Sequence, residues 1–305
     1  MFEISVIIPT YNRRKILEKT INSLIKQSLD KDKFQVIVVD DGSTDKTPDY
    51  LSAIVKSNQL NLLTITQDNT GQGEARNKGI DIAEGKILLF LGDDMIVKKN
   101  FLEEHLKIHK KYPEKNFAVL GFITWHEDIE VTKFMRWLTD GSSVLGKFGG
   151  HQFAFEKLKD KQETDYNFFY TSNISLKKDL LKKYRFDKDF KSYGWEDIEL
   201  GYRLHKLEKL KLIYNEKAVA YHHHKITEHS LKDRMRSIGK SAKILDKKHP
   251  ELKKLPGTFK KMIFKFLSNP ISLKIFKSLK DKSDTFFSLY YYSLSKKYFL
   301  QGLKE

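Results

Sequence analysis

Short runs of apolar residues alternate with segments of helical spacing over the first 125 residues, and this alternation constrains the fold more than any other feature of the chain. The apolar runs predict strands at residues 4–8, 34–39, 60–66, 86–91 and 117–123. The segments between them predict helices at residues 13–27, 46–56, 73–83 and 100–111. Strands that are apolar throughout, each followed by a helix, are typical of an α/β fold with a mainly parallel sheet covered on both faces.

The rest of the chain divides into three parts. Residues 124–170 are expected to form a long loop with short helices. Order is expected to return with residues 168–176, a helix at 195–207 and two short strands at 211–214 and 218–221, and everything from residue 228 onward has helical spacing. We therefore expect a catalytic domain of residues 1–227, followed by a helical, basic region of residues 228–305.

Composition excludes several classes of protein. Hydrophobic residues make up 40% of the chain, which is enough for a core and excludes global disorder. Cysteine is absent, so the chain has no disulfide, thiolate metal site or cysteine nucleophile. The longest apolar run has five residues, and no basic stretch followed by an apolar run opens the sequence. We therefore expect a cytoplasmic protein.

The positive charge is concentrated in the last quarter of the chain. Residues 230–305 contain 19 basic and 6 acidic residues, whereas the formal net charge of the whole chain is +16. Apolar residues recur there at helical spacing between lysines, as in Phe259, Met262 and Phe266. Such helices suit the surface of an anionic membrane, here the inner face of the cell membrane. Packing of the same faces on the catalytic domain, or on a second subunit in a homo-oligomer, is equally open.

Three pairs of acidic residues lie at loop positions, where carboxylates can act on a ligand. Asp40 and Asp41 follow the second strand, Asp93 and Asp94 follow the fourth, and Glu196 and Asp197 come later. In a parallel sheet, ligands bind beyond the carboxyl ends of the strands, so the first two pairs should meet residues 9–12 along one edge. Any one pair could be a turn or a helix cap, with Ser43 or Thr44 a candidate cap for the following helix. Three pairs together favour a site for a divalent cation with oxygen ligands.

Two further groups of residues could act at the same site. A glycine turn precedes Arg76, which would lie in the first turn of a helix and could reach a phosphate. Tyr221 is followed by three histidines, and strand alternation puts His222 and His224 on the same face. Two histidines on one face at a strand end are a moderate signal for a metal site.

Five short motifs occur in a fixed order along the chain. They are Ser5–Asn12, Val36–Asp45, Gly71–Asn77, Leu89–Asp94 and Gly194–Glu199. Together they resemble glycosyltransferase family 2, the inverting nucleotide-sugar transferases of the GT-A fold, over about residues 3–225. The resemblance implies transfer of a sugar from a nucleotide-diphosphate sugar to an acceptor hydroxyl, in cell-envelope polysaccharide or glycolipid synthesis. UDP is the family's commonest donor nucleotide, and the acceptor would be a carbohydrate or lipid-linked.

The resemblance also implies roles for individual residues. Pro9 and Tyr11 would line the nucleoside pocket, Asp41 would bond the base, Arg76 would lie near the base or phosphates, and Asp93 would hold the ribose. Asp94 would bind Mn²⁺ or Mg²⁺ as the last residue of the family's D-x-D motif, with His222 or His224 completing the site. Asp197 would be the catalytic base, and Asn173, Trp195 and Glu196 would lie near the donor sugar or acceptor. One departure is clear, because Gly92 occupies the first position of D-x-D.

Two other functions fit parts of the sequence. A nucleotidyltransferase also combines an α/β sheet with a metal and paired aspartates, but residues 9–12 are not the glycine- and lysine-rich phosphate loop that it needs. A nucleic-acid-binding protein could use the basic tail. The nearly neutral body of the chain argues against nucleic acid as the partner.

Overall fold

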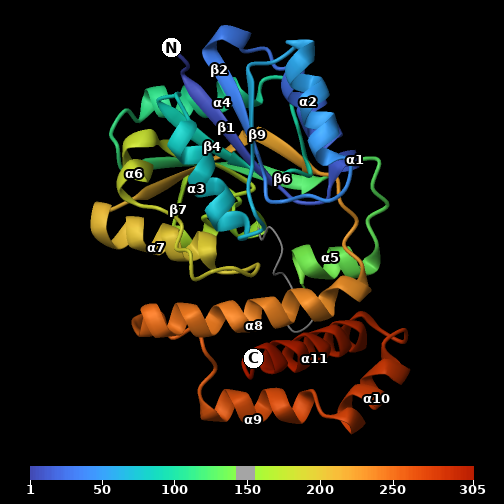
Figure 1. Cartoon of the computed structure of the whole chain (residues 1–305). Helices are drawn as coiled ribbons and strands as arrows, with labels where there is room; N and C mark the ends of the chain where they lie inside the picture. The colour runs from blue at the N-terminus through green and yellow to red at the C-terminus, as the bar shows by residue number, and fades with distance from the viewer. Residues whose placement is uncertain (142–154) are drawn as a thin grey trace. The chain divides into compact units, whose positions relative to one another are not determined.

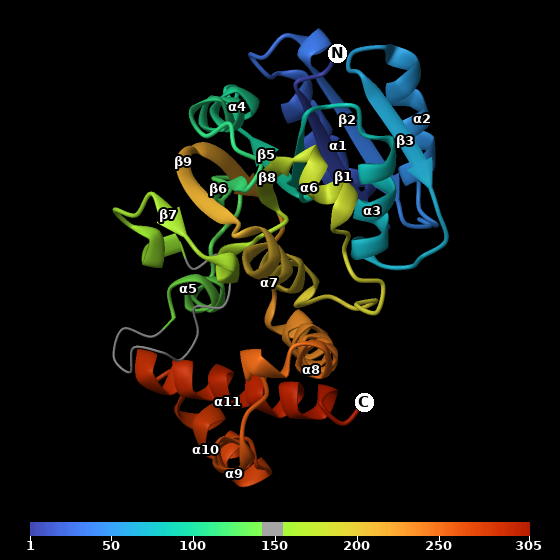
Figure 2. The same ribbon diagram turned by 90° about the vertical axis from the view of Figure 1, so that its left-hand side faces the viewer.

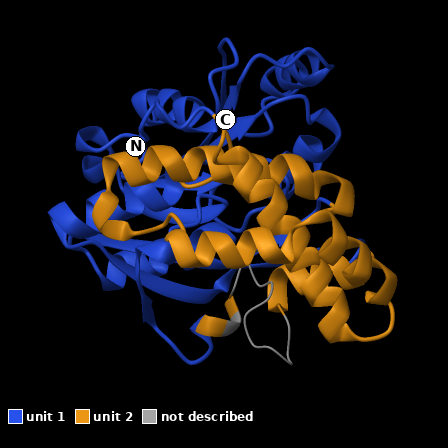
Figure 3. Ribbon diagram, turned by 90° about the horizontal axis from the view of Figure 1, so that it is seen from below, with its two compact units in different colours: residues 1–129, 158–191, 196–224 blue, residues 130–157, 192–195, 225–305 orange. Residues whose placement is uncertain are grey.

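The computed structural model describes residues 1–141 and 155–305, which divide into two compact units (Figures 1 and 3). The first, here called the sheet unit, contains residues 1–129, 158–191 and 196–224. The second, the helical unit, contains the described residues among 130–157, together with 192–195 and 225–305. The predicted domain boundary between residues 227 and 228 stays a prediction. Part of the loop expected at residues 124–170 lies outside the described residues.

The sheet unit is built on one mixed sheet of nine strands. They are β1 (Ile4–Thr10), β2 (Phe34–Asp40), β3 (Leu62–Thr66), β4 (Ile87–Leu91), β5 (Met95–Val97), β6 (Phe117–Trp125), β7 (Glu163–Thr164), β8 (Asn173–Lys177) and β9 (Lys211–His222). Eight strands follow the order β3-β2-β1-β4-β8-β6-β9-β5, and β7 pairs with β9 (Figure 2). The five strands predicted in the first 125 residues are all present.

Parallel and antiparallel pairing divide the sheet. Strands β3, β2, β1 and β4 are parallel, as expected for strands joined by helical crossovers. Strand β8 runs antiparallel to both β4 and β6, whereas β6 and β9 are parallel. The parallel half therefore brings the carboxyl ends of β1, β2 and β4 to one edge of the sheet.

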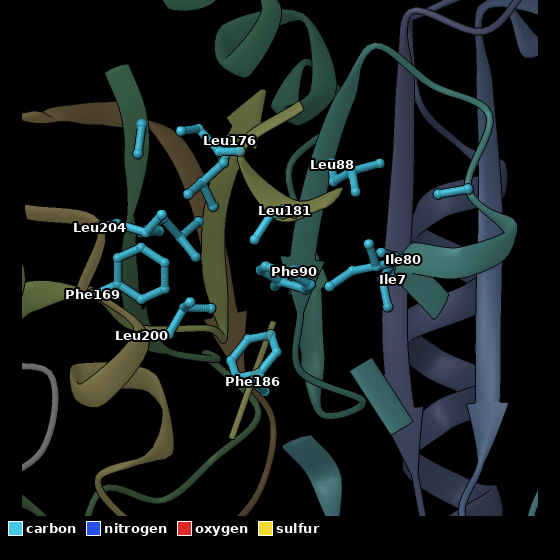
Figure 4. Packing of buried hydrophobic residues seen from close by; sticks show 14 of the residues in the cluster. Ile7, Ile80, Leu88, Phe90, Phe169, Leu176, Leu181, Phe186, Leu200 and Leu204 are labelled. Atoms are coloured by element: carbon cyan, nitrogen blue, oxygen red, sulfur yellow. The ribbon is translucent and has the colours of Figure 1, made fainter. Parts of the chain in front are cut away.

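Helices cover both faces of this sheet. They are α1 (Arg14–Ile25), α2 (Thr47–Ser57), α3 (Gln72–Ile82), α4 (Phe101–Lys111), α6 (Lys178–Lys183) and α7 (Glu196–Glu208), with 3-10 turns η1 (Lys31–Lys33) and η3 (Tyr166–Phe168). One core cluster joins α3, α6 and α7 to alternate residues of the strands, such as Ile7 and Phe90 (Figure 4). Phe186 belongs to this cluster, and its ring contacts that of Phe90 edge-on, with 5.2 Å between the two ring centroids.

The last strand of the sheet differs from its prediction. The two short strands expected at residues 211–214 and 218–221 are one strand, β9, interrupted by a bulge. Gly121 of β6 pairs with Asn215, but the next residue, Phe122, pairs with Val219. The polar and charged residues at 215–217 mark this bulge, which sequence periodicity takes for a turn between strands.

The helical unit packs aromatic side chains between its helices. It contains α5 (Lys133–Asp140), α8 (Leu231–Lys248), α9 (Thr258–Leu267), α10 (Pro270–Leu279) and α11 (Asp284–Gly302), with the 3-10 turns η4 (Glu228–Ser230) and η5 (Pro250–Leu252), while η2 (Phe155–Leu158) runs into the sheet unit. Tyr291 of α11 is fully buried against Phe134 and Trp137 of α5. No helix in the described part of the chain combines the length and the apolar character needed to cross a membrane.

The contact between β6 and β8 depends on a residue without a side chain. A methyl group at Gly121 would lie 2.5 Å from the Ala218 carbonyl oxygen and closer still to the Asn173 amide. We expect Gly121→Ala to lower the free energy of unfolding by about 1–3 kcal/mol, because the backbone must shift to admit the methyl group. Urea denaturation measures the loss. Gly257→Ala is the control, since nothing lies within 4 Å of that position, and an equal loss in both variants would contradict the argument.

Candidate active site

Three chain segments far apart in sequence meet beyond the carboxyl ends of β1, β2 and β4. Thr10, the last residue of β1, pairs with Asp40 of β2, and its hydroxyl donates to Asp93 Oδ2 at 2.8 Å. Asn12 accepts hydrogen bonds through Oδ1 from the backbone of Thr44 and Asp45, at 2.7 and 3.2 Å. The convergence predicted from the spacing of these segments is confirmed.

One predicted helix cap is wrong, and the contacts of Asn12 explain why. Helix α2 begins at Thr47, whose N–H donates to Asp45 Oδ1 at 2.9 Å. Ser43 instead accepts from the Asn12 N–H at 2.8 Å. Ser43 and Thr44 therefore join the loop after β2 to the loop after β1.

Asp41 organises the loop that leads into α3. Its carboxylate accepts from the Thr70 and Gly71 N–H groups, both at 2.9 Å, and from Gln67 Nε2 at 2.7 Å. Gly71 has φ +98°, and a side chain there would meet the Lys191 carbonyl oxygen at 2.8 Å, so glycine is required at this turn. Asp41 thereby fixes the start of α3, the helix that carries Arg76.

Arg13 neutralises the acidic pair after β4. Its guanidinium lies 3.0 Å from Asp93 Oδ1 and 2.8 Å from Asp94 Oδ2. Burial and the adjacent charge of Asp94 raise the pKa of Asp93 to about 7, although Arg13 opposes the shift. Burial alone would also raise the pKa of Asp94, but His222 and Arg13 outweigh it and hold that pKa below its usual value. Asp94 is thus the carboxylate of this pair that keeps its negative charge.

The end of β9 places two histidines beside Asp94. His222 Nε2 lies 3.4 Å from Asp94 Oδ2, and the His222 and His224 rings are 6.2 Å apart. Both imidazoles help to lower the pKa of Asp94. The prediction that His222 and His224 share a face is confirmed, and their binding of a metal stays a prediction.

A second arginine connects the start of α7 to this group. Arg76 is 4% exposed, and its Nη1 lies 3.5 Å from Glu196 Oε1. The Arg76 guanidinium also stacks near the Phe186 ring, at 5.4 Å from its centroid. Burial lowers the pKa of Arg76, while Glu196, Asp197 and Asp93 act against that shift. One guanidinium therefore lies in the field of the carboxylates that follow β4 and those that begin α7.

Asp197 accepts a backbone hydrogen bond, whereas its neighbour Glu196 forms an ion pair with Arg76. Asp197 Oδ1 accepts from the Ile198 N–H at 2.8 Å. Burial, together with the negative charge of Glu196, raises the pKa of Asp197 to about 7. A carboxylate with such a pKa can hold or release a proton near neutral pH.

The remaining predicted residues lie in different surroundings. Pro9 is buried in β1, and Tyr11 is exposed just beyond it. Asn173 is fully buried, and its amide donates to the carbonyl oxygens of Phe122 and Ala218 at 3.1 and 3.0 Å. These bonds join β8 to β6 and β9, and the predicted contact of Asn173 with the donor sugar or acceptor stays a prediction.

Trp195 belongs to the helical unit. It has φ +69°, and its indole N–H donates to the Ile238 carbonyl oxygen of α8 at 3.2 Å. The helix predicted from residue 195 begins one residue later, at Glu196. The role predicted for Trp195 near the donor sugar or acceptor stays a prediction.

The sequence did not single out several residues that contact the site. In the sequence, Arg13 resembles any arginine in the first turn of a helix. Only the structure shows that it forms ion pairs with Asp93 and Asp94. Gln72 is a second such residue, because its side-chain amide donates to Glu196 Oε1. On the opposite side of the β9 end, His223 lies near His126 and Asp128, and Lys19 Nζ is 2.9 Å from His223 Nε2. In the described residues this is a further group with the donors of a metal site.

Comparison with known proteins identifies the family. The model of "Glycosyl transferase family 2" matches residues 5–185, more than half of the chain. The chain belongs to glycosyltransferase family 2. This agrees with the family that the five motifs resemble.

Curated relatives of this family member match about two thirds of the chain or more. Validoxylamine A glucosyltransferase of Streptomyces hygroscopicus subsp. jinggangensis is 30% identical over 66% of this chain and 51% of its own length. Glycosyltransferase GlyG of Streptococcus pneumoniae is 25% identical over 72% of this chain and 70% of its own length. The chain spans about half the length of the first of these relatives.

Solved structures share the fold of this glycosyltransferase family 2 chain at low sequence identity. The structure of TarS residues 1–349 of S. aureus with UDP has a TM-score of 0.53 and 22% identity, over 92% of this chain and 75% of that one. Mannosyltransferase PcManGT of Pyrobaculum calidifontis, with GDP-Man and Mn²⁺, has a TM-score of 0.63 and 17% identity, over 98% and 85%. The fold is GT-A, with a mixed sheet flanked by helices, as the sequence predicted.

Proposed function

We propose that this chain is an inverting glycosyltransferase that moves a sugar from a nucleotide-diphosphate sugar to an acceptor hydroxyl. The observation that carries the proposal is that Arg76 lies within electrostatic reach of both Asp197 and Asp93, and that Arg13 joins Asp93 to Asp94. Family membership favours this reaction over nucleotidyl transfer. UDP is the expected donor nucleotide, since the similar TarS structure contains UDP.

The donor would lie along the edge formed by the loops after β1 and β2. Asp41 is positioned by the loop at residues 67–71, beside which Pro9 and Tyr11 would receive the nucleoside. Asp93, bonded by Thr10, would accept from the ribose hydroxyls, and Arg76 would face the base or the phosphates. A pyrophosphate suits a site that already holds two guanidinium groups.

The residues beside Asp94 fit a divalent cation. A carboxylate and imidazoles are donors that Mn²⁺ accepts, and the 3.4 Å between Asp94 Oδ2 and His222 Nε2 suits neighbouring ligand atoms. Such a cation supplies Lewis-acid stabilisation of the charge on the leaving nucleotide diphosphate. Arg13 already neutralises Asp94, so its guanidinium must share or release that carboxylate when a cation binds.

Asp197 would take the proton of the acceptor hydroxyl. As the hydroxyl oxygen attacks the anomeric carbon, its proton passes to the Asp197 carboxylate and the bond to the nucleotide diphosphate breaks. A single displacement of this kind inverts the anomeric configuration. Glu196, tied to Arg76 and Gln72, would hold the start of α7 so that Asp197 faces the acceptor.

The first experiment identifies the donor. Thermal shift with UDP-, GDP- and dTDP-sugars in the presence of Mn²⁺ should show stabilisation by one nucleotide class, because a ligand that binds only the folded state raises the unfolding midpoint. The stabilising sugar nucleotide then serves for turnover assays. Absence of any shift with all three classes, and of any donor hydrolysis, would contradict the proposed function.

Asp197→Asn should remove transfer and retain donor binding. The amide cannot accept the acceptor proton, so we expect kcat to fall by about 10²- to 10⁴-fold. Titration calorimetry with UDP should give an unchanged Kd. Asp49→Asn is the matched control, an exposed aspartate in the first turn of α2, and should keep full activity. Undiminished turnover of Asp197→Asn would remove this residue from the mechanism.

The pH dependence of transfer should report the same group. With its pKa raised to about 7, Asp197 loses its role as a base when it is protonated, so the rate should fall as pH decreases through about 7. Glu196→Gln removes a negative neighbour that raises this pKa, and the acid limb should move to lower pH. A pH–rate profile of both forms measures the shift. An acid limb that stays in place would assign it to another group.

The histidines at the end of β9 provide a matched test of the cation site. His222→Ala should weaken Mn²⁺-dependent activity by at least about tenfold, since even an outer-shell partner is commonly worth that much. His229→Ala should leave it unchanged, because His229 is exposed in η4 and belongs to neither histidine group at the end of β9. Activity against Mn²⁺ concentration, after EDTA treatment, separates the two. Full activity in EDTA would exclude a divalent cation.

A further inference from the structure

An apolar stripe covers the outer face of α9. Phe259, Met262, Ile263 and Phe266 recur at helical spacings of three and four residues, so they lie on one side of the helix. Their exposed fractions range from 41% to 75%. Phe264, on the other side, is buried against α11, where its ring lies 6.3 Å from that of Tyr292. The helix therefore presents its larger apolar face away from the core of its unit.

Helix α10 repeats the arrangement after a short connection. Ile271 and Ile275 are one turn apart and 73% and 50% exposed, whereas Leu273 between them is buried. Asn269 fixes the connection, because its side chain accepts from the Ser272 N–H at 2.9 Å and donates to the Phe266 carbonyl oxygen at 2.6 Å. Of the twelve large apolar residues exposed in the described part of the chain, six lie on these two helices. We call these six residues the α9–α10 stripe.

The charge around the stripe has a single sign. Between Glu251 and Asp281 the sequence contains eight lysines and no acidic residue. Lys261, Lys265 and Lys274 are exposed on the same helices. Two copies of this face would repel each other, so a symmetric dimer through the stripe is disfavoured. An apolar stripe bordered only by lysines instead matches a surface with negative headgroups above an apolar layer.

We propose that the α9–α10 stripe binds the surface of an anionic phospholipid bilayer. The six apolar side chains enter the boundary between headgroups and acyl chains, and the lysines contact the lipid phosphates. The helices lie along the surface, since each has ten residues and is too short to span the hydrocarbon layer. This surface would bring the enzyme to an acceptor held in the membrane, but the proposal does not depend on the reaction.

Vesicle flotation of the full chain tests the proposal. Vesicles of phosphatidylcholine with phosphatidylglycerol should carry the protein, and vesicles of phosphatidylcholine alone should carry at least tenfold less. Changing Phe259, Phe266 and Ile271 together to Ser should weaken binding to the anionic vesicles by at least tenfold. The control changes Val55, Leu63 and Leu207 to Ser, three exposed apolar residues of the sheet unit, and should bind as the parent does.

Charge and insertion can be measured separately. Lys261, Lys265 and Lys274 changed to Gln should reduce the preference for anionic vesicles and its sensitivity to salt. Because the chain contains no cysteine, Phe266→Cys provides a single labelling site for a polarity-sensitive dye. Its emission should shift to the blue on adding anionic vesicles, whereas the same dye at Leu207→Cys should not respond.

Three results would overturn the proposal. The parent protein could fail to float with anionic vesicles, or the triple Ser variant of the stripe could float as well as the parent. Light scattering could also show a parent dimer that the same variant dissociates, which would assign the stripe to a second copy of the chain. Donor binding measured on each variant separates these results from any failure of the proposed transferase activity.

Discussion

The neutralisation of clustered carboxylates by two arginines is the interaction on which the site depends. Parallel strands bring their carboxyl ends together, and with them the acidic residues that follow β2 and β4. Buried carboxylates at such a place are costly unless a cation or a backbone N–H meets each of them. Arg13 meets Asp93 and Asp94, Arg76 meets Glu196, and the amides of Thr70 and Gly71 meet Asp41. These contacts therefore offset the cost of burying the carboxylates at the sheet edge.

The same neutralisation separates the chemistry of neighbouring residues. Asp93 and Asp94 are adjacent, yet burial raises the pKa of one while His222 and Arg13 lower that of the other. Glu196 is held by Arg76 and Gln72, whereas Asp197 next to it has a pKa near 7. Each of these two pairs thus contains one aspartate whose pKa is raised to about 7. This pairing lets a small site provide both a permanent charge and a proton acceptor.

Much of this arrangement could be predicted from the sequence. Apolar runs followed by helical segments indicated the strands β1, β2, β3, β4 and β6, and the position of acidic residues just after them indicated the shared edge. Alternation along β9 indicated that His222 and His224 share a face. These features are local, or follow from a rule of topology that holds for parallel sheets generally.

Other features depend on contacts that no local pattern contains. The bulge in β9 is stabilised by Asn215, whose amide donates to the Glu104 carbonyl oxygen of α4, so its polar residues resemble a turn only when α4 is ignored. Arg13 and Gln72 find their carboxylate partners 80 or more residues away along the chain. The cap predicted for α2 is wrong because Ser43 and Thr44 bond to Asn12 of another loop. The features that the sequence does not predict are therefore mainly those that depend on long-range partners of polar side chains.

The bulge between β6 and β9 also decides which imidazoles meet Asp94. Three residues of β9 are passed over between Asn215 and Val219, and the strand then continues in register to His222. Side chains alternate along a strand, so sliding β9 by a single position would exchange the two sides of its end. His223 would then turn toward Asp94, and its two neighbours would turn toward His126. A length change of one residue in this irregular stretch would thus change which histidines lie beside Asp94.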